Sequence, residues 1–327
     1  MLLSLLQIRQ ASQTPTTKKN IIDLIFETSP FMAFMKFETV PSRVSKWFMT
    51  RELPTSGFRA YGGSYSSTTS KDDMGETNLK ILGGDFSIDR LDQNAQAVDG
   101  SKKVAREIRN MTMSMAMKAK YNFINGDLAN DPNEFNGLKR FHTANNVFGT
   151  SQTLELASAG STFAAAGGRA TLEFLEDFLN QTIVLPDVVF CDETHITQLK
   201  ALAMASGTNE AFANMFTTEE YPLPNGRRIK IGRFSGVPFI PMKADAAGNK
   251  VIDYNETSPN GANSVCSSMY SMVIGEDFFA PLQHSANGPE ITSAIQDGHL
   301  KTFLDWAIAL EPRHHKCSAK AAAIKAV

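Results

Sequence analysis

The 327-residue sequence is poor in cysteine and has no excess of either charge. Its three cysteines are odd in number and widely spaced, which argues against a disulfide framework and indicates a reducing compartment. The 32 Lys and Arg residues nearly balance the 34 Asp and Glu residues, for a net charge of -2. Tight binding to a phosphate backbone needs clustered cations, because it is driven by counterion release. The composition therefore favours a protein that encloses or tolerates nucleic acid over one that grips it.

Long apolar runs are also missing. No stretch approaches the roughly 18 apolar residues needed to cross a bilayer. The N-terminal MLLSLLQIRQ has no positive charge before its short apolar run and no small-residue cleavage site after it, unlike a secretory signal. We therefore expect a soluble protein made in the cytosol, with no membrane partner.

The common motifs of catalysis and nucleotide binding do not occur. The sequence lacks the Walker loop, the Gly-x-Gly-x-x-Gly loop, the Gly-x-Ser-x-Gly elbow and the Ser-x-x-Lys pair. It therefore predicts no catalytic residue and no cofactor. Carboxylates that converge from distant positions would escape this search, so an enzyme with a dispersed site stays an alternative.

The histidines do not form a metal set at a recognised spacing. Asp192 and Glu193 precede His195, but carboxylates at a helix start are explained by capping without a metal. Near the C-terminus, His314, His315 and Cys317 lack a fourth ligand close by. We expect no metal site, and we interpret the residues after Pro312 as a solvated basic tail, either a short helix or an extension.

The first 90 residues predict two elements that do not form a compact domain. Residues 1–43 are interpreted as an arm, with one short amphipathic element closed by Ser29-Pro30. The segments 44–53 and 79–89 are strand-like and flank a polar stretch, which predicts an extended hairpin over 44–90. A two-stranded ribbon is marginal alone in water, so we expect a partner surface, such as another subunit.

A long helix is predicted over 91–125, ending at Asn125-Gly126. About 30 residues would span roughly 45 Å. The apolar residues expected on one face of this helix are Ala97, Val104, Ile108, Met111, Met115, Ala119 and Phe123.

The rest of the chain mixes short strands with two capped helices. Thr171 and Asp192 or Thr194 are the expected N-caps. Alternation between apolar and polar or small residues over 304–310 predicts a half-buried strand. The fold class is therefore α+β.

Several turn and strand signatures occur in a familiar order. They are Gly83-Gly84-Asp85-Phe86-Ser87-Ile88-Asp89, Glu134-Phe135-Asn136-Gly137-Leu138, Pro186-Asp187-Val188-Val189-Phe190-Cys191, Phe234-Ser235-Gly236-Val237-Pro238-Phe239 and Trp306-Ala307-Ile308-Ala309-Leu310. With the arm, hairpin and long helix, this order resembles the tailed-phage major capsid proteins of the Hong Kong 97 (HK97) type over about 20–312. The individual motifs are not specific, so the resemblance rests on their order and spacing.

The resemblance implies an HK97-like fold with an N-terminal arm (1–43), an extended hairpin loop (44–90), a peripheral domain with a long spine helix (91–155 and 285–327) and an axial domain (156–284). It also implies a homo-oligomeric shell of hexamers and pentamers, assembled in a bacterial host cytoplasm around double-stranded DNA and located in the virion. Scaffolding and portal proteins are the expected partners. Because only a short arm precedes the hairpin, any scaffolding segment is either a separate protein or already removed.

In such a shell, the hairpin of one subunit would lie over its neighbour. The candidate inter-subunit contacts are Trp47, Phe48, Tyr61, Lys71, Asp72, Asp73 and Glu76. Some members of the family cross-link a hairpin lysine, but nothing in the sequence requires this of Lys71. Ordinary exposed loop charges are the alternative for the charged candidates. An encapsulin-like bacterial compartment, which shares the fold, is the alternative for the whole protein.

Overall fold

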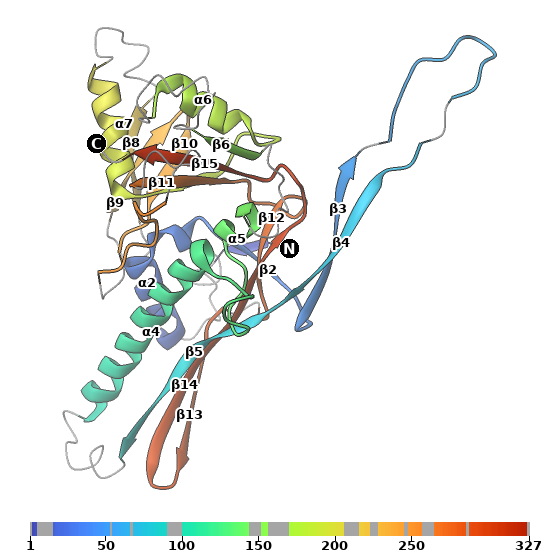
Figure 1. Ribbon diagram of the computed structural model, residues 1–327. Coiled ribbons are helices and arrows are strands. Elements are labelled where there is room, and N and C mark those ends of the chain that lie inside the picture. The colour runs from blue at the N-terminus through green and yellow to red at the C-terminus, as the bar shows by residue number, and fades with distance from the viewer. Residues whose placement is uncertain are drawn as a thin grey trace.

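The protein is described by a computed structural model that covers residues 2–4, 16–52, 54–65, 68–89, 100–143, 152–155, 170–205, 216–222, 228–244, 248–256, 265–285 and 288–325. Two sheets and a separate two-stranded ribbon are joined by helices (Figure 1). The mixture of sheets and segregated helices confirms the α+β class.

The first sheet runs in the order β1-β2-β12-β14-β13, and a sixth strand, β5, also pairs with β14. Its strands are β1 (Leu2–Ser4), β2 (Lys36–Thr39), β5 (Lys80–Asp89), β12 (Phe279–Gln283), β13 (Glu290–Gln296) and β14 (His299–Pro312). Strand β14 pairs with β5 on one side, and with β13 and β12 in succession on the other. The predicted strand over 304–310 is confirmed, since it forms the central part of β14.

The second sheet has seven strands in the order β6-β15-β11-β7-β10-β9-β8. Its strands are β6 (Thr153–Glu155), β7 (Val188–Cys191), β8 (Phe216–Pro222), β9 (Arg228–Phe234), β10 (Val237–Pro241), β11 (Cys266–Met272) and β15 (Ser318–Lys325). Helices α6 (Leu172–Asn180) and α7 (Glu193–Ala205) lie beside this sheet in Figure 1. The Thr171 cap is confirmed, because its side-chain oxygen accepts a hydrogen bond from the Phe174 N–H.

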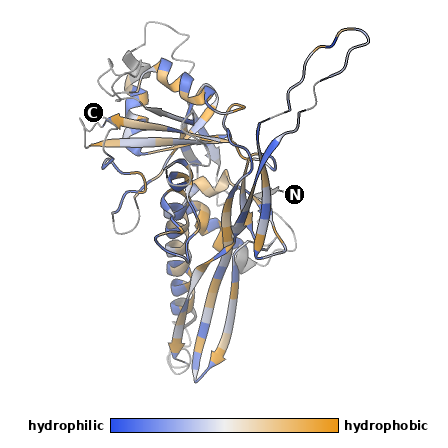
Figure 2. Ribbon diagram, turned by 45° about the vertical axis from the view of Figure 1, so that its right-hand side comes forward, coloured by the Kyte–Doolittle hydropathy of each residue, from blue (hydrophilic) through white to orange (hydrophobic). Residues whose placement is uncertain are grey.

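The long helix is α4 (Gly100–Asn125), which ends where the sequence predicts. Its buried positions include Met115, Ala119 and Phe123, on the predicted apolar face. The predicted start, 91–99, lies outside the described residues. The helix runs alongside the long strands β5, β14 and β13 (Figure 1), and hydrophobic colour continues to the far ends of these strands (Figure 2).

The expectation of an unpacked arm over 1–43 is wrong for the part that the structure describes from residue 19 onward. Helix α2 (Thr16–Thr28) buries Ile22, Ile25 and Phe26 completely, and β2 extends the first sheet. A 3-10 turn, η1 (Pro30–Ala33), connects them. The apolar residues of this short amphipathic element are core residues because α4 covers them, and the Ser29 hydroxyl donates to the Ala116 carbonyl of α4.

The hairpin is real, but its second strand was predicted in the wrong place. Strand β3 (Val44–Glu52) pairs with β4 (Lys71–Asn78), whereas the predicted partner, β5, pairs with β14 instead. β4 escaped prediction because Met74 is its only apolar side chain and none of its residues is buried, so it carries no apolar alternation.

The C-terminal tail is neither a helix nor a solvated extension. Strand β15 is an interior strand of the second sheet, between β6 and β11, and seven of its eight residues are buried. Its Ala-rich sequence favours a helix by propensity, yet small side chains suit a strand packed beneath α6.

The predicted domain boundaries change accordingly. β6 and β15 fall in the predicted peripheral domain, but they pair within the second sheet, whose other strands lie in the predicted axial domain, 156–284. β12 falls within 156–284 but belongs to the first sheet.

Two adjacent glycines of β5 give a matched stability test. A Cβ on Gly83 would overlap the Leu304 carbonyl oxygen of β14, whereas one on Gly84 would meet the flexible Met111 side chain at 3.6 Å. We predict that Gly83→Ala lowers the free energy of unfolding by about 2 kcal/mol, as overpacking does, and that Gly84→Ala changes it little. Urea unfolding of the dissociated subunits measures both variants. Equal effects would contradict the close approach of β5 to β14.

Candidate assembly surface

The β3–β4 ribbon projects from the body of the molecule (Figure 1). Its strands pair from Val44–Asn78 to Glu52–Lys71, with one irregularity between Thr50 and Glu52. The described residues of the connecting tip, 54–65 and 68–70, are all exposed. The ribbon therefore carries most of its side chains outside any core that the described residues form.

One face of the ribbon is apolar at its centre. Phe48 and Met74 are directly opposite each other, and their side chains are 65% and 76% exposed. Lys46 and Glu76 form the next pair on this face, because side chains two residues apart share a face. Exposed aromatic residues continue into the tip, where Tyr61 extends fully into solvent. This face offers apolar area that the described part of the chain leaves uncovered.

Trp47 lies on the opposite face and packs within the hairpin. Its indole Nε1 donates to the Thr77 hydroxyl at 2.9 Å, and its ring covers Gly75 so closely that a Cβ there would overlap it. Among the two aromatic candidates on β3, Phe48 is thus the exposed one, and Trp47 stabilises the ribbon.

Two of the charged candidates pair within the ribbon. Lys71 Nζ lies 2.7 Å from Glu52 Oε2, and Asp73 forms an ion pair with Arg51. Exposed pairs of this kind contribute at most about 1 kcal/mol each. The third, Asp72, accepts a hydrogen bond from the Ser70 hydroxyl at 3.4 Å. Of these contacts, only the Lys71–Glu52 and Arg51–Asp73 pairs join the two strands, and they are compatible with the observed register.

A turn between β14 and β15 holds the ribbon against the body. Thr50 forms a β-bridge with His314, and His315 Nδ1 donates to the Thr50 carbonyl at 3.2 Å. The two imidazole rings stack at 4.7 Å, and Cys317 is buried. The residues that the sequence assigned to a solvated tail therefore anchor the hairpin.

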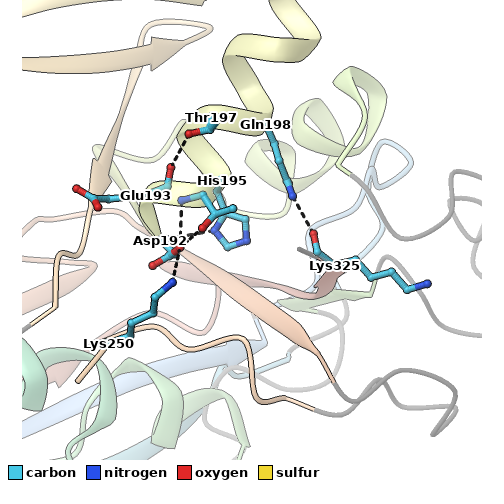
Figure 3. A network of polar contacts seen from close by, with 8 residues as sticks. Asp192, Glu193, His195, Thr197, Gln198, Lys250 and Lys325 are labelled. Carbon is cyan, nitrogen blue, oxygen red and sulfur yellow. Dashed lines mark hydrogen bonds and ion pairs between the residues drawn. The ribbon is translucent and has the colours of Figure 1, made fainter. Parts of the chain in front are cut away.

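A second polar cluster lies at the start of α7 (Figure 3). Asp192 Oδ2 accepts a hydrogen bond from the Thr194 N–H at 3.0 Å, and Lys250 Nζ lies 3.4 Å away. Burial raises the pKa of Asp192, but hydrogen bonds from Thr194 and the charge of Lys250 outweigh it, so the net shift is downward. His195 Nδ1 accepts from the Asp192 N–H at 3.2 Å. These contacts cap the helix, as the sequence predicted.

The same helix is tied to the second sheet, since Gln198 Nε2 donates to the Lys325 carbonyl at 2.8 Å (Figure 3). In the part of the chain that the structure describes, no three His, Cys, Asp or Glu residues gather as metal ligands would. No described helix combines the length and hydropathy of a membrane span.

Solved structures that share this fold include an encapsulin and two capsids. Over 90% of this chain and 86% of the other, it matches the SrpI encapsulin of Synechococcus elongatus, with a TM-score of 0.60 and 11% identity. It matches the capsid of cyanophage A-1(L) over 91% and 93% of the two chains, with a TM-score of 0.58 and 13% identity. It matches the capsid of a native GTA particle over 92% and 90%, with a TM-score of 0.54 and 11% identity.

The sequence itself has no such matches. No protein-family model matches it, and no curated protein does. The predicted resemblance to HK97-type capsid proteins is thus confirmed at the level of the fold.

Two buried histidines make the fold sensitive to acid. Burial lowers the pKa of His142 to about 3 and that of His195 to about 4, from 6.5. The unfolded chain therefore binds more protons below pH 6.5, and stability falls as the pH drops from 6.5 toward 4. We predict a loss of about 1.4 kcal/mol per pH unit for each histidine, measured by urea unfolding.

His142→Gln is the control for this prediction. It removes one titrating group, so its stability should fall less steeply with acid than that of the wild-type chain by about 1.4 kcal/mol per unit. Identical slopes between pH 6 and 4.5 would show that His142 is not buried in its neutral form.

Proposed function

We propose that this chain is the major capsid protein of a tailed phage. Subunits assemble into hexamers and pentamers of an icosahedral shell that encloses double-stranded DNA. The observation that carries the proposal is the projecting β3–β4 ribbon, with Phe48 and Met74 exposed at its centre. A two-stranded ribbon gains too little from its own pairing to be stable in water, so it needs a second surface.

That surface belongs to a neighbouring subunit. A ribbon that leaves one side of a molecule and lies on a different surface of the next copy makes a heterologous contact, and such contacts form a ring when the rotation between subunits closes. Each Å² of apolar surface covered contributes about 25 cal/mol, so the aromatic side chains of the ribbon supply association energy. Lys46 and Glu76 lie beside the apolar pair, and they help to fix the register of the contact between subunits more than they raise its affinity.

The near-neutral charge suits a container. With a net charge of -2, the shell wall holds DNA by enclosure rather than by phosphate contacts. A portal protein and a scaffolding protein are the proposed partners, assembly takes place in the host cytoplasm, and the product is located in the virion. Catalysis is no part of this role.

An encapsulin-like compartment is the second candidate, because the match to the SrpI encapsulin is as good as that to the cyanophage capsid. The contents of particles purified from the natural source distinguish the two. Nuclease-protected DNA of genome length supports the capsid, whereas a protein cargo without DNA supports the compartment. A dispersed-site enzyme would instead turn over a substrate as a free monomer.

We predict that the double variant Phe48→Ser, Met74→Ser abolishes assembly while leaving the subunit folded. Because Phe48 and Met74 are 65% and 76% exposed, removing both side chains costs each contact about 2 to 4 kcal/mol. Sedimentation velocity measures the fraction of subunits in shells, and circular dichroism checks the fold. The matched control is Leu128→Ser, at an exposed apolar position outside the ribbon. Normal shells from the double variant would contradict the assembly role of this face.

A further inference from the structure

Strand β13 leaves one edge of the first sheet open. It pairs with β14 over all seven of its residues, from Glu290–Asp305 to Gln296–His299, without an irregularity. No other described strand pairs with β13, so it ends the sheet on that side. An unpaired edge presents a row of backbone N–H and C=O groups that can template a further strand.

The turn that follows β13 fixes which residues point to the open edge. Asp297 and Gly298 have φ values of 49° and 77°, as in a two-residue type I′ turn. In such a hairpin the flanking pair, Gln296 and His299, is hydrogen-bonded, and bonded pairs then alternate along the ladder. Ile291, Ser293 and Ile295 therefore direct their N–H and C=O groups away from β14.

The sequence of β13 carries little of the usual protection of an edge strand. Natural edge strands carry lysine, proline or a bulge that blocks pairing with a second chain. The sequence of β13, EITSAIQ, has no lysine and no proline, and its one charge is Glu290 at the first position. Ile295 is 65% exposed although it is apolar. Both the unpaired backbone groups and the side chains of β13 therefore allow a second strand to pair with it.

We infer that β13 pairs antiparallel with β13 of a second copy of this chain, about a two-fold axis through Ser293. In this register Ser293 lies opposite itself, and Ile291 lies opposite the partner's Ile295. All three outward residues of each strand then form both of their backbone hydrogen bonds, about six in total. Sliding the pairing by two residues in either direction leaves one isoleucine of each strand without a partner.

The side chains agree with this register. Ile291 and Ile295 share a face of the sheet, so pairing covers the exposed Ile295 with the partner's Ile291. On the other face, Glu290 lies opposite the partner's Gln296, whose amide can donate to the carboxylate. No like charges oppose each other.

The β13 contact adds a second kind of interface to the proposed shell, and its role in that shell rests on the proposed function. The ribbon contact is heterologous and closes rings, whereas the β13 contact is isologous. A two-fold contact of this kind joins one ring of subunits to the next. A shell needs both kinds of contact, and the first alone gives isolated capsomers.

Cysteine cross-linking tests the register. Ser293→Cys places two Cα atoms about 5.5 Å apart across the axis, which is within the range of a disulfide. Ala294→Cys is the matched control, since it is equally exposed but is offset from its copy by two residues, about 7 Å along the strand. After mild oxidation of assembled particles of each variant, we expect a covalent dimer from Ser293→Cys and at least tenfold less of it from Ala294→Cys.

A proline scan of the edge tests the hydrogen bonds. Ser293→Pro removes only an outward N–H, so the subunit should stay folded while ring-to-ring association is lost. Ala294→Pro removes an N–H that bonds to β14 and should instead destabilise the subunit. Sedimentation separates capsomers from shells, and thermal unfolding reports the fold.

The outcomes separate this inference from the proposed function. If the wild-type chain forms shells but Ser293→Cys cross-links no better than Ala294→Cys, the β13 pairing is overturned and the shell function stands. If Ser293→Pro still forms shells, the pairing is likewise overturned. If the wild-type chain remains monomeric and neither cysteine cross-links, both fail.

Discussion

Strand β14 pairs with β5 along one edge while β13 and β12 share the other, and its face toward the core buries Leu304, Trp306 and Ile308. The Trp306 ring packs 5.2 Å from that of Phe37. Because β5 is held to β14 over ten residues, the ribbon strand that immediately precedes β5 leaves the body in a fixed direction. The same strand sets the edge position of β13. Both surfaces that we assign to assembly therefore depend on the pairing of one strand.

Elements with a strong local signal could be predicted from the sequence. Alternation located the centre of β14, and a threonine before an amphipathic run located the start of α6, because in each case the residues that decide the structure are neighbours in the sequence. The end of α4 at Asn125 followed from the Asn-Gly signal. The order of these elements was enough to reach the correct fold.

Other elements depend on contacts that no local pattern encodes. Helix α2 is a core element because α4 covers it, and β15 is a strand because β11 and β6 flank it. β4 looks like a loop because the described residues bury none of its side chains, which is the property that makes it a candidate contact. One missed signal was available: Asp297-Gly298 between alternating residues is a strong hairpin signature, and it would have revealed β13.

Only the structure distinguishes the candidate contact residues that are exposed from those that pack within the ribbon. Trp47 and Phe48 are adjacent in sequence, yet Trp47 packs within the ribbon and Phe48 is exposed, because successive side chains of a strand point to opposite faces. We propose that a neighbouring subunit covers the exposed face of the ribbon that carries Phe48 and Met74. Cryo-electron microscopy of particles formed by the wild-type chain tests this contact. We predict closed shells with the β3–β4 ribbon lying on an adjacent subunit, whereas shells in which Phe48 and Met74 face solvent would contradict the proposal.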